Sequence, residues 1–415
     1  MKKKVAIIGL GYIGLPTAVF FALKGIEAAG ADINPKTVEK VNNGENPIFE
    51  PTLDDMVKQA VSSKKLRAAT VPEQADAFII AVPTPFKENH EPDISYVLNA
   101  VESIANVVKS GDIIILESTS PVGTTEIIAK KLQELRPDLK IPTNSDEDGE
   151  IFISYCPERM IPGNVFELIK NDRIIGGINE KSALETKKIY ELIIEGQIIC
   201  TNSRTAEMSK LTENSFRDVN IAFANELSII CDKIGINVFE LIKLANHHPR
   251  VNILTPGCGV GGHCIAVDPW FIISQTPEQS KLLHTARLIN DYKPQFVLGK
   301  VDEKVNELIS NGKSINEIKI ACLGLSFKPN IDDLRESPAI KIASILSQKY
   351  PNVISVEPHI KELPEKYKNS GIKLESIEKA LTADIIVPLV KHKAFINLDL
   401  QDIKEKLVDY IGLNQ

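Results

Sequence analysis

The chain has 415 residues, of which 43% are hydrophobic and 25% are charged, and its formal net charge is −7. This composition is typical of a soluble globular protein of about two or three domains. The acidic balance argues against nucleic acid as a partner, because phosphate backbones are bound by surplus lysine and arginine.

The start of the chain, "MKKKVAIIGLGYIGLP", superficially resembles a secretion signal, but its glycines favour a first strand. No apolar run approaches the ~20 residues that a membrane-spanning helix needs, so we expect no membrane partner. The six cysteines are scattered, without a framework spacing. They predict reduced thiols in a cytoplasmic protein.

The first part of the chain alternates between expected strands and helices. Residues 5–8 form a continuous apolar run, as in a parallel strand that is buried on both faces. Further strands are expected within 75–85 and 112–119, with a helical pattern over 94–109 between them. This alternation predicts a doubly wound parallel sheet.

The sequence "GLGYIG" stands between the first strand and the first helix. Its first glycine permits a tight turn, its second lets a pyrophosphate approach the backbone, and its third lets helix and strand pack closely. Asp32 ends the next strand, where a carboxylate accepts hydrogen bonds from a ribose 2′-hydroxyl and repels a 2′-phosphate. We therefore expect NAD rather than NADP; a plain glycine turn is the alternative. The expected NAD contacts here are Gly9, Gly11, Tyr12, Ile13, Gly14 and Asp32.

Two later turns are placed to line the same site. "AVPTP" and "ESTSPVGTT" follow further strands, and ligands of open α/β sheets bind beyond the carboxyl ends of the strands. We expect Thr84 and Thr119 to contact the cofactor, although ordinary turn chemistry explains both segments about equally well.

Residues 204–235 predict a long helix, because they lack proline and have glycine only at the end. Its apolar residues cover more than one face, so it must pack against more than one neighbour. Joining two sheet domains, or pairing with its copy in a homodimer or higher homo-oligomer, would satisfy it. A second helical stretch is expected over 277–309.

The last quarter of the chain repeats the order of the first. "IKIACLGLSFKP" is similar to "KKVAIIGLGYIGLP", and "ADIIVPLVKHKAF" to "ADAFIIAVPTPF". We expect an α/β protein with two Rossmann-like doubly wound parallel-sheet domains joined by a long central helix and a helical region. The expected domains are 1–203, 204–312 and 313–415.

The stretch "GVGGHCIAVDPW" surrounds Cys264 with glycines and places Asp268 four residues later. A metal ligand, a structural thiol and a nucleophile are the possible functions of this cysteine. The neighbouring histidines and Cys258 form no recognisable zinc spacing, so we expect no metal. A nucleophile fits better, because glycines leave room for a substrate carbon and a nearby cation promotes the thiolate. Lys210 and Asn214 share one face of the long helix, which indicates either a polar groove or a solvated stripe.

These motifs resemble the UDP-glucose/GDP-mannose 6-dehydrogenase family over essentially the whole chain. The resemblance is carried by "GLGYIGLP", "STSPVG", "CPER", "KLTENSFRDVNIAFANE", "GVGGHCIAVDP" and "FKPNIDDLRESP". Within the family, "HHPRVN" and the histidine before the cysteine are similar to the branch that acts on UDP-N-acetyl-D-mannosamine. The resemblance implies an NAD-linked four-electron oxidation of a sugar-nucleotide alcohol to a carboxylate, by way of a thiohemiacetal and a thioester.

The resemblance also implies catalytic roles. Cys264 is the nucleophile, Lys210 stabilises the oxyanion, and Asn214 positions this lysine or a water. Asp268 assists proton transfer, and Thr119 with Glu158 holds the catalytic water.

Further residues are expected to bind the ligands. Arg335 resembles a contact to the cofactor phosphates, Lys328 a substrate-binding lysine, and Arg250 an arginine that reaches the substrate of a partner subunit. The full expected substrate-binding set is Glu158, Arg159, Met160, Lys210, Asn214, Arg217, His248, Arg250, Gly261, His263 and Lys328.

One segment departs from the pattern of the glucose enzymes. After Glu158 the sequence reads "RMIPG", with Pro162 where those enzymes carry a second glutamate, so no cofactor contact is carried over for this loop. Arg159, Arg217, His248 and His263 are candidates for recognising the N-acetyl group and the configuration at carbon 2.

Other functions stay open. UDP-N-acetylglucosamine, UDP-N-acetylgalactosamine and UDP-glucose are alternative substrates for the same chemistry. A two-electron alcohol dehydrogenase or an epimerase would need no cysteine, and a sensor of NAD or of a sugar nucleotide would release no product.

Overall fold

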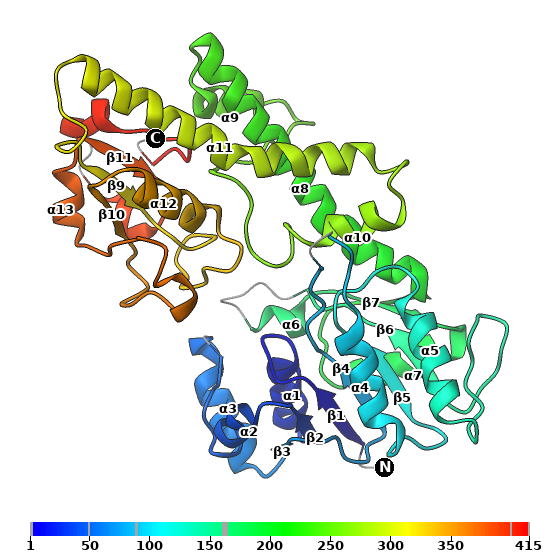
Figure 1. Ribbon diagram of the computed structural model, residues 1–415. Coiled ribbons are helices and arrows are strands. Elements are labelled where there is room, and N and C mark those ends of the chain that lie inside the picture. Colours follow the sequence, from blue (N-terminus) through cyan, green and yellow to red (C-terminus); the bar gives the residue numbers. More distant parts are fainter. Residues whose placement is uncertain (1–2, 49, 88–89, 160–164, 399–400, 414–415) are drawn as a thin grey trace. The chain divides into compact units, whose positions relative to one another are not determined.

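The computed structural model describes residues 3–48, 50–87, 90–159, 165–398 and 401–413 (Figure 1). It divides into two compact units, Met1–Thr212 and Glu213–Gln415, and each is described by itself. The boundary falls within one long helix, α8 (Ser203–Ile234).

The first unit is built on an eight-stranded sheet of order β3-β2-β1-β4-β5-β6-β7-β8. Neighbouring strands run parallel from β3 to β6, β7 is antiparallel to β6, and β8 is parallel to β7. The strands are β1 (Lys4–Ile8), β2 (Glu27–Ala31), β3 (Leu66–Ala69), β4 (Ala77–Ile80), β5 (Ile113–Leu116), β6 (Phe152–Tyr155), β7 (Arg173–Gly177) and β8 (Ile198–Asn202).

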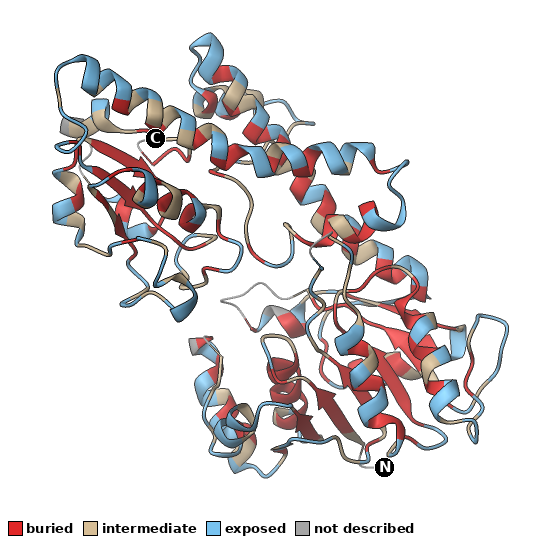
Figure 2. Ribbon diagram, in the orientation of Figure 1, coloured by how far each residue is buried: buried red, intermediate tan, exposed pale blue. Residues whose placement is uncertain are grey.

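Helices cover both faces of this sheet. The helices are α1 (Gly14–Leu23), α2 (Pro35–Asn42), α3 (Asp54–Ser62), α4 (Ser95–Ala105), α5 (Thr124–Leu135), α6 (Glu167–Lys170) and α7 (Glu180–Tyr190). Side chains of β1 alternate between two cores: Val5 and Ile7 join the cluster that includes α1, α3 and α7, whereas Ala6 and Ile8 join the cluster that includes α4 and α5. All four side chains are buried, as a parallel strand covered on both faces requires (Figure 2).

The second unit contains a parallel three-stranded sheet of order β10-β9-β11. Its strands are β9 (Ile320–Leu323), β10 (Val353–Val356) and β11 (Ile385–Pro388). Its helices, besides the greater part of α8, are α9 (Val238–Ala245), α10 (Asp268–Gln275), α11 (Lys281–Ser310), α12 (Pro338–Lys349), α13 (Ile377–Leu381) and α14 (Lys393–Ile396). Apolar residues of α11, α12 and the three strands form one core.

The internal repeat expected from the sequence is visible in the strand order. The order β10-β9-β11 of the second sheet matches β2-β1-β4 of the first. Gly9 and Gly324 follow the two equivalent strands with φ of 96° and 93°. Each donates its N–H to the last residue of the neighbouring strand, Ala31 or Val356, at 2.8 Å.

The predicted fold class is therefore confirmed, and so is the long helix, which ends at Ile234 and is followed by Gly235 with φ of 72°. The reversal at β7 was not foreseen, because a buried apolar strand reads the same in either direction. Among the described residues, no helix is both long enough and apolar enough to cross a membrane.

Candidate active site

The glycine loop after β1 has the shape that a dinucleotide requires. A Cβ atom on Gly9 would lie 2.6 Å from the carbonyl oxygen of Ala81, and one on Gly14 would lie 1.9 Å from that of Gly9. At Gly11, by contrast, no described residue other than Gly11 and its two chain neighbours comes within 4 Å of that position. Gly9 and Gly14 thus allow close packing, whereas Gly11 leaves open space at the start of α1, where a phosphate can approach.

Asp32 lies beside this loop, at the end of β2. Its Oδ2 accepts a hydrogen bond from the N–H of Leu10 at 2.9 Å, and its Oδ1 accepts one from the N–H of Asn34 at 2.9 Å. The carboxylate is fixed by two backbone donors and is only partly buried. It remains able to accept the hydroxyls of a ribose. The residues present therefore fit NAD.

Thr84 and Thr119, both expected at the cofactor, are brought together. The Thr84 hydroxyl donates to the Thr119 carbonyl at 2.6 Å, and the Ser118 hydroxyl donates to the Val82 carbonyl at 2.7 Å. The turns that follow β4 and β5 are thereby tied to each other beyond the carboxyl ends of the sheet.

Glu158 follows β6, and side chains from other parts of the first unit donate hydrogen bonds to the backbone around it. Arg173 donates to the carbonyl of Pro157 at 2.9 Å, Lys210 to that of Glu158 at 2.7 Å, and Asn171 to that of Arg159 at 3.1 Å. Three consecutive carbonyls thus accept three side-chain donors. The resemblance implies separate catalytic roles for Lys210 and Glu158, and the structure places the Lys210 ammonium against the Glu158 backbone carbonyl.

The Glu158 side chain is buried, and this burial raises the pKa of its carboxyl to about 7. The positive charges of Arg173 and Lys210 oppose this effect, and the negative charge of Glu117 adds to it. A carboxyl group with a pKa near neutrality can take up and release a proton at working pH, which suits a general base.

Arg173 and Glu117 form a buried ion pair that the sequence did not reveal. Their closest nitrogen and oxygen atoms are 3.6 Å apart, and the exposed fractions of the two side chains are 1% and 0%. Tyr190 and Thr17 donate to the two oxygens of Glu117 at 3.2 and 3.1 Å. An arginine within an apolar strand, in "NDRIIGG", is the signal that could have pointed to this pair.

Glu207 is a second residue that the sequence did not single out. It is fully buried on α8 and accepts hydrogen bonds from the N–H groups of Gly123 and Thr125 at 2.6 and 2.8 Å. A carboxylate at the first turn of α5 satisfies unpaired N–H groups and complements the helix dipole. It fixes the turn that begins with Thr119 to the helix that carries Lys210.

In the second unit, the turn that contains Cys264 leads directly into α10. The Cys264 carbonyl accepts hydrogen bonds from the N–H groups of Val267 and Asp268 at 3.0 and 2.8 Å. Asp268 is 3% exposed, and its Oδ2 accepts a hydrogen bond of 2.5 Å from the Asn214 side chain. Three of the predicted catalytic residues, Cys264, Asp268 and Asn214, are thus brought together. Cys264 itself is exposed, and none of the six cysteines, all described, forms a disulfide.

The glycines before Cys264 have a different purpose from the one expected. The sequence suggested that they clear an approach to the thiol, but their missing side chains make room for the chain itself. A Cβ atom on Gly261 would lie 2.6 Å from the Glu336 carbonyl oxygen, and one on Gly262 would lie 2.8 Å from the Phe327 ring. Gly262 also has φ of 81° and donates to the Arg335 carbonyl at 3.1 Å. The glycines therefore dock the cysteine turn against the segment 327–336.

This docking places His263 near two other predicted ligand-binding residues. Desolvation of the ring, followed by the positive charges of Arg335 and Lys328, lowers the pKa of His263, and Asp333 opposes this effect. Arg335 is held by Asp333, whose Oδ2 accepts from the guanidinium at 2.6 Å. The structure thus gathers positive charge around the histidine before the thiol.

Other expected residues lie elsewhere in the second unit or outside the described residues. Arg217 is exposed on α8, and His248 and Arg250 are exposed in the turn after α9, where the Arg250 N–H donates to the His248 ring at 3.3 Å. Met160 lies outside the described residues, as does Pro162. Among the residues that are described, no three His, Cys, Asp or Glu side chains are grouped to hold a metal ion.

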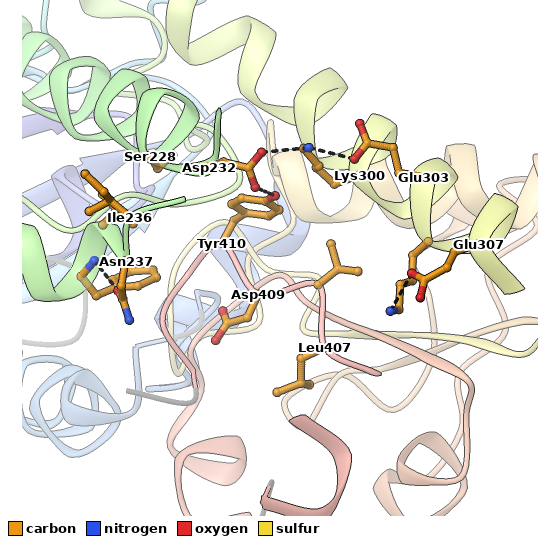
Figure 3. Close-up of a pocket in the computed structure, with 14 residues that line it drawn as sticks. Ser228, Asp232, Ile236, Asn237, Lys300, Glu303, Glu307, Leu407, Asp409 and Tyr410 are labelled. Carbon is orange, nitrogen blue, oxygen red and sulfur yellow. Dashed lines mark hydrogen bonds and ion pairs between the residues drawn. The ribbon is translucent and has the colours of Figure 1, made fainter. Parts of the chain in front are cut away.

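A pocket of about 490 Å³ also lies in the second unit (Figure 3). Residues of α8, α9, α11 and the segment 407–410 line it, and none of the residues predicted for catalysis is among them. Asp232 forms an ion pair with Lys300 at 2.8 Å and accepts a hydrogen bond from the Tyr410 hydroxyl at 2.6 Å. These contacts attach the segment 407–410 to α8 and link α8 to α11.

The sequence matches the UDP-glucose/GDP-mannose dehydrogenase family in three consecutive segments. Residues 3–194 match its NAD binding domain, 204–292 its central domain and 321–411 its UDP binding domain. The first match confirms the expectation that the glycine loop belongs to an NAD-binding unit.

Individual relatives and a solved structure agree with this. The chain is 56% identical to UDP-N-acetyl-D-mannosamine dehydrogenase of Campylobacter jejuni over 95% of this chain and 97% of the relative. It is 53% identical to NDP-N-acetyl-D-galactosaminuronic acid dehydrogenase of Ralstonia nicotianae, over 98% and 95% of the two chains. The structure of UDP-D-ManNAc dehydrogenase from Pyrococcus horikoshii is similar with a TM-score of 0.86 and 39% identity, and covers 98% of this chain and 93% of that one. The glycine loop, the carboxylate after β2, the cysteine turn and these matches place the chain in the UDP-glucose/GDP-mannose dehydrogenase family.

Proposed function

We propose that this protein oxidises UDP-N-acetyl-D-mannosamine to UDP-N-acetyl-D-mannosaminuronate, with NAD as the oxidant and a covalent intermediate on Cys264. The observation that carries the proposal is the 56% identity, over nearly the full length of both chains, to a dehydrogenase of that substrate. The exposed thiol lies on the turn that leads to Asp268, and the Asp268 carboxylate accepts a hydrogen bond from Asn214 of α8; this arrangement supports the covalent step.

The NAD-binding residues would be those of the glycine loop, Asp32, Thr84 and Thr119, with Arg335 reaching the phosphates. Bound NAD supplies the hydride acceptor for each of the two oxidations at carbon 6. Both oxidations take place at one carbon, so the sugar nucleotide must stay bound while the cofactor is exchanged.

The chain's own residues would manage the carbonyl chemistry. The Cys264 thiolate attacks the aldehyde carbon, and the carbonyl oxygen becomes the hydroxyl of a thiohemiacetal. Loss of a hydride and a proton from this adduct gives a thioester. Water then adds to the thioester and gives one proton to a base, the carbon–sulfur bond breaks to regenerate the thiolate, and the carboxylic acid loses its proton to solvent as the carboxylate leaves.

Polar side chains would stabilise these steps. The Lys210 ammonium stabilises the oxyanion, and Asn214 keeps the Asp268 carboxylate in place for proton transfer. Glu158, whose pKa is near 7, would accept the proton of the attacking water, which Thr119 helps to hold.

We further propose that Lys328 and Gly261 contact the nucleotide part, and that Arg159, Met160, Arg217, His248 and His263 recognise the sugar. Arg250 would reach the site of a partner subunit.

The exposed apolar side chains of α8 support a homodimer or a larger homo-oligomer. Phe216, Phe223 and Ile230 are spaced by seven residues, with exposed fractions of 67%, 50% and 47%. Residues at this spacing lie along one side of a helix. In this proposal 204–312 acts as the dimerisation region between domains 1–203 and 313–415, and the protein is cytoplasmic.

The substrate is tested by incubating the protein with NAD and each of four sugar nucleotides: the UDP derivatives of N-acetylmannosamine, N-acetylglucosamine, N-acetylgalactosamine and glucose. The expected result is the highest kcat/KM with UDP-N-acetylmannosamine and two NADH for each sugar consumed. The galactosamine arm matters most, because a relative at 53% identity is named for N-acetyl-D-galactosaminuronic acid. Preference for any other sugar would contradict the proposed substrate, and one NADH per sugar would contradict the four-electron reaction.

A further inference from the structure

The sheets of the two units carry the same hydrogen-bonded arrangement around an acidic residue. In the first unit, Oδ2 of Asp32 accepts from the Leu10 N–H at 2.9 Å and Oδ1 accepts from the Asn34 N–H at 2.9 Å. In the second unit, Oε2 of Glu357 accepts from the Leu325 N–H at 2.7 Å and Oε1 from the His359 N–H at 3.1 Å. Glu357 therefore occupies the position in its sheet that Asp32 occupies in the first.

A second pair of positions corresponds in the same way. After β4 the Ala81 N–H donates to Ile8 of β1 at 2.8 Å, and after β11 the Leu389 N–H donates to Leu323 of β9 at 2.9 Å. Counting three residues onward from each reaches Thr84 in the first unit and His392 in the second.

In the second unit these two positions are joined to each other. Nε2 of His392 lies 3.2 Å from Oε2 of Glu357 and 3.3 Å from the Ser326 hydroxyl, and the imidazole is fully buried. Glu357 is 7% exposed and also accepts the Ser326 N–H at 3.1 Å. Asp32, the acidic residue of the first unit, is expected to bind a ribose, whereas Glu357, its counterpart in the second unit, is covered by His392.

The other ring nitrogen of His392, Nδ1, contacts the loop that carries Lys328. Nδ1 accepts a hydrogen bond of 2.9 Å from the backbone N–H of Asn330. A backbone N–H can only donate, so Nδ1 is the acceptor in this bond, and Nε2 is the nitrogen that faces Glu357. The imidazole therefore connects Glu357, which follows β10, to Asn330 at the far end of the loop 326–330.

That loop carries Lys328 between its two anchored ends. Ser326 is anchored through its N–H to Glu357, and its hydroxyl donates to the Lys328 carbonyl at 2.8 Å. Asn330 has φ of 62°, and its side chain accepts the Lys393 N–H at 2.9 Å, at the start of α14. The loop lies within the segment that matches the UDP binding domain.

We propose that His392 is a positioning residue for UDP binding, which holds the Lys328 loop by accepting the Asn330 N–H while it is itself held by Glu357. The inference rests on the proposed function, because it takes Lys328 to be a UDP-binding residue. Glu357 and His392 correspond to Asp32 and Thr84, which are predicted NAD contacts in the first unit. In the second unit they would instead position a loop that binds UDP.

Two substitutions separate the two bonds of the imidazole. His392→Asn keeps an acceptor where Nδ1 was and loses the group at Nε2, whereas His392→Gln keeps a group near Nε2 and loses the acceptor for Asn330. UDP binding to the full-length protein is measured by calorimetry, with NAD binding and thermal unfolding as measures of folding. The matched control is His359→Asn, because this histidine is exposed and its ring centroid is 5.1 Å from that of His392.

The expected result is that His392→Gln weakens UDP binding by about tenfold, that His392→Asn weakens it much less, and that NAD binding is unchanged in both. In kinetics, KM for the sugar nucleotide rises in the Gln variant while kcat stays within about twofold. Unchanged UDP affinity in the Gln variant overturns the inference, and so does an equal loss in both variants. Failure of the unsubstituted protein to bind UDP would instead contradict the proposed function.

Discussion

The ammonium group of Lys210 donates a hydrogen bond of 2.7 Å to the backbone carbonyl of Glu158. Lys210 thereby fixes the turn after β6, and its positive charge lowers the pKa of a carboxyl group that burial raises. One side chain thus has two effects on its neighbour: it positions the backbone and it favours the carboxylate.

Replacing Lys210 is therefore expected to affect both the rate and its pH dependence. Lys210→Met removes the bond and the charge, and we expect kcat to fall by about 10²–10³-fold, as for the loss of an oxyanion-stabilising group. The acid limb of the pH–rate profile should also move to higher pH. Lys233→Met is the matched control, because Lys233 is exposed near the end of the same helix. Equal losses in the two variants would show that the effect is on α8 as a whole.

The pH dependence of the reaction should report Glu158. Its pKa is about 7, so the carboxyl is protonated below that pH and the rate should fall as pH decreases through about 7. Glu158→Gln should abolish most of the activity and should remove the acid limb of the pH–rate profile. A limb near the ordinary glutamate value of about 4.3 would contradict Glu158 as the base.

Arg173 should shift that limb without contacting substrate. Its charge stabilises the Glu158 carboxylate, so Arg173→Met should raise the pKa of Glu158 and move the limb to higher pH. Arg173→Lys keeps the charge and should shift the limb less. Thermal unfolding must be measured in parallel, because the change leaves Glu117 buried without its counter-charge. A limb that stays in place in a folded Arg173→Met variant is the contrary result.

The contrast between Asp32 and Arg173 shows what the sequence could predict and what it could not. The position of Asp32 follows from local order, because a strand, a glycine turn, a helix and a second strand bring it beside the loop. Arg173 meets Glu117 only because β7 runs antiparallel beside β6 and brings its first residue near the end of β5. Hydrophobic periodicity carries no information on strand direction, so this pairing was not predictable.

The glycines near Cys264 illustrate a second limit. A glycine in the sequence signals that no side chain fits, but not which group takes the space. At Gly262 it is Phe327, which is distant in the chain and meets the cysteine turn through the fold of the second unit. The same pattern at Gly11 does leave open space, and only the three-dimensional surroundings distinguish the two cases.

Gly11 and Gly9 should therefore respond differently to alanine. Gly11→Ala should leave thermal stability unchanged and weaken NAD binding by about tenfold or more, because the methyl group takes the space of the phosphates. Gly9→Ala should lower stability by about 2 kcal/mol or more, since φ is 96° and the Ala81 carbonyl is 2.6 Å away. UDP binding serves as the control in both. A Gly11→Ala variant with unchanged NAD affinity would remove the loop from the cofactor site.

The oligomeric state should depend on the exposed stripe of α8. Phe223→Glu places a charge at the middle of Phe216, Phe223 and Ile230 and should convert a dimer into monomers at micromolar concentration, as measured by light scattering. Leu184→Glu is the control, because that leucine is 47% exposed on α7. A protein that is already monomeric before substitution refutes the proposed interface.

The covalent step should depend on one of the two exposed cysteines, Cys264 and Cys200. Cys264→Ser replaces the thiol by a hydroxyl that is far harder to deprotonate, so the thioester cannot form at a useful rate. The unsubstituted protein is expected to form two NADH for each sugar consumed. For the Cys264→Ser variant we expect no more NADH than one molecule per active site, and any product should be the aldehyde rather than the acid. Cys200→Ser should keep the full yield, because Cys200 lies on β8, outside the predicted site. Mass spectrometry after rapid acid quench should detect a sugar-nucleotide adduct on Cys264 in the unsubstituted protein and none in the Cys264→Ser variant. Two NADH per sugar from that variant would mean that the second oxidation proceeds on the hydrated aldehyde, and the thiol would then have no chemical role.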